Sequence, residues 1–412
     1  MNTLRDLLGP RRSTEPRERD RFLRRYGLSR NPFPPSRTIL PEVMYNQSAA
    51  LKKFADAVDA ILDPMDISRR SVAVVGGTGA GKTHFLRHCQ YLFKSYTDEE
   101  DCGRYVEVEY QAGTGSSVSL VREMLRRADD RCAKDGEFDL INGLINAGLN
   151  SSHVRNVRMD DLRKSLLTLL EASSPDFEPR DKNKVFTYEH LREVMKRWLA
   201  GNTLTATERG QLDVSGRLAT APIMIRVMSE LFALAQSIEA IGGVLLCLDE
   251  IESVFSSGIA TAKVQTFLQD LRYLFDESVK PELGYSLTII SASTQRGAAS
   301  LRDYNFPLYQ RLGFESENRE ELKSILSFEE AQDFANVYID YEKVRSEEDD
   351  VVRRAARSPA RSLIDEDDLQ QALSKATPTR RGWSSGEPAS QAQLLEALHH
   401  IVEEKRRETA AS

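Results

Sequence analysis

The sequence of 412 residues contains few cysteines and histidines. Its four cysteines include no Cys-x-x-Cys pair, and its six histidines do not fall at metal-ligand spacing with them; the cysteines are Cys89, Cys102, Cys132 and Cys247. Disulfide frameworks and structural zinc sites both depend on such spacing. We therefore expect neither disulfide bonds nor a structural zinc ion.

Long apolar runs are also missing. A membrane-spanning helix needs about 18 or more consecutive apolar residues, and the sequence has no such run. The arginine-rich N-terminus is not followed by the apolar stretch that a secretory signal requires. With 40% hydrophobic residues the chain is long enough for two or three domains with a core. We expect a globular, cytoplasmic protein with no membrane partner.

The formal net charge of −7 conceals an asymmetry along the chain. Residues 1–37 carry ten arginines against four acidic residues, a net charge of +6, which leaves −13 for the rest. A basic arm on an acidic body favours a polyanion such as double-stranded DNA, or an acidic protein surface, as a partner. A solvated, loose tail explains the same composition equally well.

The most specific motif is a phosphate-binding loop, or Walker A motif, directly after the apolar run 71–75. Backbone N–H groups of such a loop surround phosphate oxygens, which leaves no room for a Cβ at Gly76, Gly79 and Gly81, while the lysine adds a positive charge. The threonine hydroxyl is placed to bind Mg²⁺ as the next helix begins. The nucleotide-binding residues are predicted to be Gly76, Gly77, Thr78, Gly79, Ala80, Gly81, Lys82, Thr83 and His84.

Adenine is favoured over guanine as the base of the nucleotide. GTPases carry an Asn-Lys-x-Asp signature, and the one similar stretch, Asn183-Lys184-Val185-Phe186, ends in phenylalanine. ATP with Mg²⁺ is therefore the expected ligand, and a GTPase or a small-molecule kinase is disfavoured.

A second apolar run, 244–248, ends in the acidic pair Asp249-Glu250. Parallel strands carry their ligands at their carboxyl ends, so these acids are predicted to lie beside the phosphate loop. Asp249 is expected to hold the Mg²⁺ shell, and Glu250 to orient and polarise the attacking water. Capping of the following helix is the structural alternative for both residues.

A third apolar run, 287–292, ends in Ser293-Thr294-Gln295. One of these polar side chains is expected to reach the γ-phosphate or the water, and Thr294 is preferred. An ordinary turn at the end of a strand is an equally good reading.

The order of apolar runs and helical periods predicts an α/β fold with a parallel sheet. Residues 103–110 add a strand by their alternating pattern, and beyond Phe314 only helices are indicated. The predicted helices are 47–62, 84–93, 120–133, 160–172, 188–199, 222–240, 262–275, 327–339, 346–356, 366–376 and 390–404.

This ordered set of motifs resembles an AAA+ ATPase of the origin-recognition/Cdc6-like branch. The segment with Gly27-Leu28 and Asn31-Pro32-Phe33 also resembles the linker of TniB/ExeA-type ATPases. The 166 residues between Lys82 and Asp249 indicate a long insertion. This insertion, with its stretch Met195 to Gly201, is similar to the ORC-like ATP-binding proteins of BREX-type phage-defence systems. The implied domains are a basic arm and linker (1–44), a first part of the ATPase core (45–116), a helical insertion (117–240), a second part of the core (241–318) and a helical lid (319–412).

The resemblance also implies residues that act between subunits or from the lid. A ring-forming ATPase presents an arginine to the γ-phosphate of its neighbour, and Arg311 is the candidate, with Arg302 as the second choice. An ordinary surface ion pair is the alternative for Arg311. Arg380 or Arg381 is the candidate phosphate contact from the lid.

Two functions from different classes follow. The first is an ATP-hydrolysing oligomeric switch or motor, with ATP between identical subunits, that acts on DNA or a DNA-bound partner in phage defence or a mobile-element system. The second is a nucleotide-sensing adaptor that binds protein partners and hydrolyses ATP slowly, without DNA contact. The predicted DNA-binding residues of the first are Arg11, Arg12, Arg17, Arg19, Arg24 and Arg25.

Overall fold

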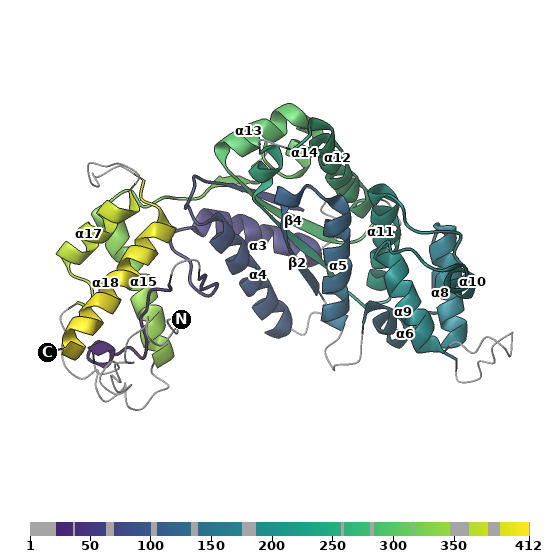
Figure 1. Ribbon diagram of the computed structural model, residues 1–412, viewed down its shortest axis with the longest axis horizontal. Coiled ribbons are helices and arrows are strands. Elements are labelled where there is room, and N and C mark those ends of the chain that lie inside the picture. The colour runs from purple at the N-terminus through teal and green to yellow at the C-terminus, as the bar shows by residue number, and fades with distance from the viewer. Residues whose placement is uncertain are drawn as a thin grey trace, which may run out of the picture. The chain divides into compact units, whose positions relative to one another are not determined.

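The computed structural model describes residues 22–35, 38–62, 70–99, 105–132, 139–174, 187–256, 259–280, 284–315, 317–346, 362–377 and 388–411. The chain divides into two compact units (Figure 1). The first, here called the sheet unit, comprises Ser48–Gly77 and Phe85–Leu322. The second, here called the terminal unit, comprises Met1–Gln47, Thr78–His84 and Lys323–Ser412.

The sheet unit is built on a five-stranded parallel sheet, with the strands in the order β2-β3-β4-β1-β5. The three central strands, β3, β4 and β1, are buried along their whole length. Their sequences are accordingly near-continuous apolar runs, as is typical of strands that are covered on both faces. The predicted α/β fold with a parallel sheet is confirmed. The strands are β1 (Ser71–Val75), β2 (Tyr105–Gln111), β3 (Gly243–Asp249), β4 (Leu287–Ser293) and β5 (Arg319–Glu321).

Helices cover both faces of this sheet (Figure 1). One face carries α3 (Ser48–Leu62) and α4 (Lys82–Glu99); Thr288 on β4 donates a hydrogen bond to the Ala57 carbonyl of α3, and Phe93 of α4 packs edge-on against Tyr105 of β2. The other face shares one hydrophobic core with α5 (Ser117–Cys132), α11 (Ala221–Ser237) and α12 (Thr261–Ser278). Side chains alternate between the two faces along each strand, so both faces are apolar.

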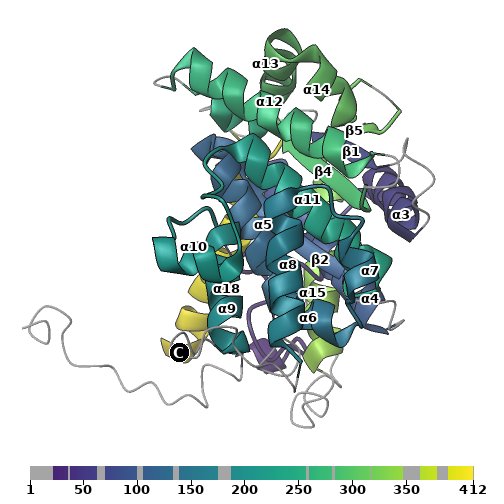
Figure 2. The same ribbon diagram turned by 90° about the vertical axis from the view of Figure 1, so that its right-hand side faces the viewer.

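The long insertion between β2 and β3 is helical, as predicted. Figure 2 shows these helices from their own side of the molecule. Their amphipathic faces share the core of α5 and α11, with Trp198 fully buried and its indole N–H donating to the Gly216 carbonyl at 2.8 Å. Besides α5 and α11 they are α6 (Leu140–Asn146), α7 (Ser151–Val154), α8 (Asp160–Ala172), α9 (Tyr188–Leu199) and α10 (Ala206–Leu212).

The prediction that only helices follow Phe314 is wrong at one element. β5 pairs in parallel with β1 as an edge strand. It has three residues, Arg-Glu-Glu, none of them fully buried. Backbone pairing with the open edge of β1 forms this strand, and its side chains carry no hydrophobic period that reveals it. Short helices α13 (Gln295–Tyr304) and α14 (Phe306–Arg311) precede it.

The terminal unit has its own hydrophobic core. Its helices are α15 (Phe328–Ser346), α17 (Glu366–Ala376) and α18 (Gln391–Ala411). Phe22, Leu23, Leu28 and Phe33 from the N-terminal segment are buried in the same core. The predicted helix over 346–356 lies outside the described residues beyond Ser346.

No helix within the described ranges is both long enough and apolar enough to cross a membrane.

Candidate functional site

Three chain segments leave the sheet at the same edge of the sheet unit. β1 and β3 both run parallel to β4 and lie on either side of it. Val75, the last residue of β1, is in register with Ser293, and the Gly76 N–H donates to the Ser293 carbonyl at 3.1 Å. Gly76 and Asp249 are therefore about two strand spacings, roughly 10 Å, apart at the carboxyl edge. A parallel α/β sheet places its ligands at this edge.

The two acids at the end of β3 differ in exposure. Asp249 is 1% exposed, whereas Glu250 is on the surface. Glu250 has left-handed backbone angles, φ 53° and ψ 43°, and its N–H donates to the Asp249 Oδ1 at 2.8 Å. A non-glycine residue in this conformation costs on the order of 1–3 kcal/mol. This turn sends one carboxylate into the protein and the other outward, so the adjacent acids have separate surroundings.

The left-handed turn at Glu250 also starts a short helix, η3 (Ile251–Phe255). Glu252 on this helix accepts a hydrogen bond from the Thr294 N–H at 3.2 Å. Glu252 therefore joins the ends of β3 and β4.

The three polar residues after β4 have different surroundings. Thr294 caps α13, because its hydroxyl accepts the Gly297 N–H at 3.0 Å. Gln295 accepts a hydrogen bond from Arg319 at 2.6 Å. The Ser293 hydroxyl is fully buried and has no hydrogen-bond partner among the described residues. The preferred residue, Thr294, is thus engaged in local structure, and its contact with a phosphate stays a prediction.

Residues Thr78–His84 of the phosphate loop belong to the terminal unit. Gly79 and Gly81 have φ of +79° and +86°, which side chains disfavour, so the motif glycines are required by the backbone itself. Lys82 and Thr83 form the first turn of α4, where helix N–H groups and the helix dipole favour anions. The His84 imidazole Nε2 is 2.9 Å from the Leu40 carbonyl oxygen, which fixes the ring.

The first turn of α18 packs against the phosphate loop inside the terminal unit. The Gln391 N–H donates to the Gly79 carbonyl at 3.1 Å, and its side-chain amide donates to the Lys323 carbonyl at 3.2 Å. A Cβ at Gly79 would lie 2.1 Å from the Ser390 hydroxyl oxygen. Sequence reasoning missed Ser390 and Gln391, although a serine before an amphipathic helix is a known N-terminal signal.

Arg311 is paired within its own chain. Its Nε donates to Asp276 Oδ1 at 2.6 Å, its Nη1 donates to the Pro307 carbonyl at 3.1 Å, and its side chain is 29% exposed. Arg302, on the exposed surface of α13, has no ion pair among the described residues. A role for either arginine at a neighbouring subunit stays a prediction.

Several predicted residues lie outside the described part of the chain. These are the lid candidates Arg380 and Arg381 and the arm residues Arg11, Arg12, Arg17 and Arg19. Arg24 and Arg25 lie in the described segment that begins at Phe22, where the Arg25 N–H donates to the Phe22 carbonyl.

The residue types of the site fit a nucleotide with Mg²⁺. Within the described ranges, no group of three or more His, Cys, Asp or Glu residues is placed to hold a metal ion. Magnesium bound to a nucleotide takes most of its ligands from phosphates and water, and needs from the protein only a hydroxyl and a carboxylate. Thr83 and the buried Asp249 supply these two types.

Comparisons with known proteins were made at the levels of family, sequence and structure. No family model matches the chain, and no curated protein does. Solved structures similar to it include the Aeropyrum pernix ORC1 protein in complex with DNA, at 11% identity and a TM-score of 0.42, covering 90% of this chain and 65% of the other. The ADP form of the Aeropyrum pernix ORC2 protein has 12% identity and a TM-score of 0.42, with 88% and 70% covered. The match thus spans just under two thirds of the ORC1 chain, and the fold of this protein is assigned from its own parallel sheet.

Proposed function

We propose that this protein binds and hydrolyses ATP as an oligomeric switch that acts on DNA or on a DNA-bound partner. The observation that carries the proposal is the meeting, at one sheet edge, of the strand that leads into a phosphate loop and the strand that ends in Asp249-Glu250. An acidic pair after a strand is common by itself, but its pairing with a phosphate loop is typical of ATP hydrolysis.

The residues divide the chemistry of hydrolysis between them. Backbone N–H groups of the loop and the Lys82 ammonium group would bind the phosphates, and Asp249 and Thr83 would hold the magnesium ion. When bound, the magnesium ion neutralises charge on the phosphates. Glu250 is exposed on the surface and accepts a hydrogen bond from the attacking water, which orients that water.

ATP is proposed to lie between identical subunits, with Arg311 contributing to the site of its neighbour. In the single chain Arg311 is bound to Asp276, so subunit contact has to exchange this ion pair for the γ-phosphate. An arginine supplied in this way accelerates hydrolysis by about 10³–10⁵-fold. The DNA partner is proposed from the ten arginines of residues 1–37, and a role in phage defence or a mobile-element system from the resemblance of the inserted helices.

Mixing two inactive variants tests the shared site. Lys82→Ala removes phosphate binding, and Arg311→Ala removes the residue offered to the neighbour, so each protein alone is expected to lose hydrolysis. A mixture contains interfaces where an intact loop meets an intact Arg311, and phosphate release should return at these interfaces. Lys52→Ala, which changes an exposed lysine on α3, is the matched control and should remain fully active. No recovery in the mixture would contradict a site completed by Arg311.

A further inference from the structure

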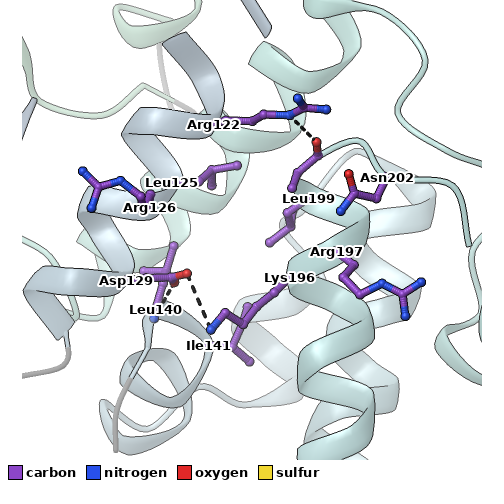
Figure 3. Close-up of a pocket in the computed structure, with 11 residues that line it drawn as sticks. Arg122, Leu125, Arg126, Asp129, Leu140, Ile141, Lys196, Arg197, Leu199 and Asn202 are labelled. Atoms are coloured by element: carbon purple, nitrogen blue, oxygen red, sulfur yellow. Dashed lines mark hydrogen bonds and ion pairs between the residues drawn. The ribbon is translucent and has the colours of Figure 1, made fainter. Parts of the chain in front are cut away.

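The inserted helices enclose a pocket of about 260 Å³ between α5, α6 and α9 (Figure 3). Its floor is apolar and is formed by Leu125, Leu140, Ile141 and Leu199. All the elements that line it belong to the sheet unit. Sites for whole small molecules measure about 300–1,000 Å³, so this pocket suits one or two apolar side chains better than a complete cofactor.

The edge of the pocket carries polar groups with unused hydrogen-bonding capacity. Arg122 Nε donates to the Ala200 carbonyl at 2.7 Å, as Figure 3 shows, and its guanidinium makes no ion pair among the described residues. Its two terminal amino groups remain available to a carboxylate. The Asn202 side chain is exposed beside it and makes no hydrogen bond in the described part of the chain.

The other cations at the edge are already paired. Arg126 contacts Glu123 at 2.6 Å and Asp130 at 2.7 Å. Arg197 contacts Glu208 at 2.6 Å, and Lys196 lies 3.3 Å from Asp139. The residues that line the pocket therefore include four cations and one acid, Asp129, and acids nearby hold three of the four cations.

This pairing of the cations distinguishes between two classes of partner. DNA-binding surfaces are strongly positive, because every contact is made beside a phosphate. Protein-binding sites combine a desolvated apolar centre, often with arginine, and a polar rim of mixed charge. The pocket has the second composition, because its floor is apolar and three of its four cations are already neutralised by acids, which leaves only Arg122 without an ion pair among the described residues.

We propose that this pocket is a docking site for a partner protein, which inserts a leucine or phenylalanine between α5 and α9 and places an adjacent carboxylate against Arg122. The site is separate from ATP hydrolysis and needs no nucleotide. The apolar floor supplies affinity, and Arg122 with Asn202 sets the preference for an acidic neighbour.

A set of labelled peptides tests the proposal by fluorescence anisotropy on the full chain without nucleotide. The probe contains leucine and phenylalanine flanked by aspartates. Two comparison peptides replace either the aspartates by lysine or the apolar residues by serine. We expect the acidic, apolar probe to bind with a Kd of roughly 10–100 μM, and both comparison peptides to bind at least about tenfold more weakly.

Two variants locate the binding, and a third serves as a control. Arg122→Glu should raise the Kd of the probe by about tenfold or more, because the charge at the rim is reversed. Asn202→Trp changes an exposed position and covers the floor without altering charge, so it should have a similar effect. Arg155→Glu makes the same charge change at an exposed residue after α7, and it should bind the probe like the parent protein.

Several results would overturn the proposal. One is no probe binding up to about 1 mM, and another is equal binding of the three peptides. Displacement of the probe by duplex DNA, with DNA binding lost in Arg122→Glu, would assign the pocket to nucleic acid instead. Self-association that is abolished by Asn202→Trp in sedimentation would assign it to a second copy of this chain.

Discussion

At the scale of single residues, Glu250 combines a strained backbone with an exposed carboxylate. Its left-handed conformation at φ 53° is held by the hydrogen bond from its N–H to Asp249. Strain of this kind persists only where the surrounding structure enforces it, and it is common at functional sites. Asp249 is buried and Glu250 is exposed, and the proposed mechanism assigns the first to the metal and the second to the water.

Replacing Glu250 by glutamine separates these two roles. The variant keeps the size and hydrogen-bonding length of the side chain but loses the base that activates water. We expect ATP binding within about twofold of the parent protein and phosphate release lowered by about 10²–10⁴-fold. Binding is measured with a fluorescent ATP analogue and hydrolysis by phosphate release. Normal hydrolysis in Glu250→Gln would remove this residue from the chemistry.

Asp129 is a second residue with unusual surroundings, on α5 in the insertion. Burial raises the pKa of its carboxyl group to about 6, against the opposing effect of a hydrogen bond from the Leu140 N–H at 3.0 Å. The folded state therefore holds this proton more tightly than the unfolded chain does. The contribution of Asp129 to the free energy of unfolding falls as pH rises from about 4 to about 6, by an amount on the order of 3 kcal/mol.

The variant Asp129→Asn should remove this dependence, because the amide oxygen still accepts the Leu140 N–H but carries no charge. At pH values from about 5 to about 8, the free energy of unfolding of the variant should exceed that of the parent protein by about 1–3 kcal/mol. Urea unfolding at the two pH values measures the difference. Asp130→Asn is the matched control, since this neighbouring carboxylate is 56% exposed. An equal shift in both variants would contradict the role of burial.

At the scale of elements, the phosphate loop and the first turn of α18 restrict each other. Gly79→Ala should lower the stability of the terminal unit by about 2 kcal/mol or more, through the positive φ and the contact with Ser390. Gly77→Ala is the control within the same motif, because a Cβ there has no neighbour within 4 Å. It should change stability by less than about 0.5 kcal/mol.

A double variant separates backbone strain from steric contact at this position. The substitution Ser390→Gly removes the Ser390 hydroxyl and Cβ, the two atoms nearest to a Cβ at position 79, and leaves the Cα of position 390 at 3.6 Å. Glycine is tolerated at a helix N-cap. The cost of Gly79→Ala should therefore be smaller in this background. An unchanged cost would mean that α18 does not restrict the loop.

The sequence predicted helices well where the periodic apolar pattern extended over several turns. α8, α9 and α17 have the predicted bounds, and α3, α5 and α12 differ by one to three residues at their ends. α4, α15 and α18 extend six or seven residues beyond their predicted ends. Amphipathic spacing over three or more turns identifies such helices. β5 and the short helices α6, α7 and α10 were missed, since a few residues carry no recognisable period and form through pairing or packing with distant segments.

The candidate site was predictable to the extent that its residues follow strands. Asp249 and Glu250 were expected at the sheet edge because an apolar run delivers them there. The choice among Ser293, Thr294 and Gln295 depends in part on hydrogen bonds with Glu252 and Arg319, which are distant in sequence and leave no local signal. The contact of α18 with the phosphate loop joins positions 79 and 390, and single-sequence patterns contain no information on such a pairing.

At the scale of the whole molecule, the basic N-terminal arm is the proposed contact with DNA. Phe22 and Leu23 belong to the core of the terminal unit, so a truncation that tests the arm should stop at residue 21. Removing residues 2–21 takes away six of the ten arginines of the first 37 residues. We expect duplex DNA to bind the full chain with steep salt dependence, and this slope to fall by several units in the truncated chain. Full-length protein with these six arginines changed to glutamine should match the truncation.

An unchanged salt slope in both variants would assign DNA binding to another surface. No binding of the full chain to duplex DNA at low salt would favour the adaptor function, with proteins as the only partners.

The central claim is that the loop after β1 and the acids after β3 together bind ATP with magnesium, and calorimetric titration tests it most directly. The parent protein should release or absorb heat on addition of ATP with Mg²⁺ and saturate at one nucleotide per chain. Lys82→Ala should give no binding heat, and Asp249→Asn should bind ATP without the magnesium dependence. Absence of heat with the folded parent protein, or equal titrations for the parent and Lys82→Ala, would contradict the account.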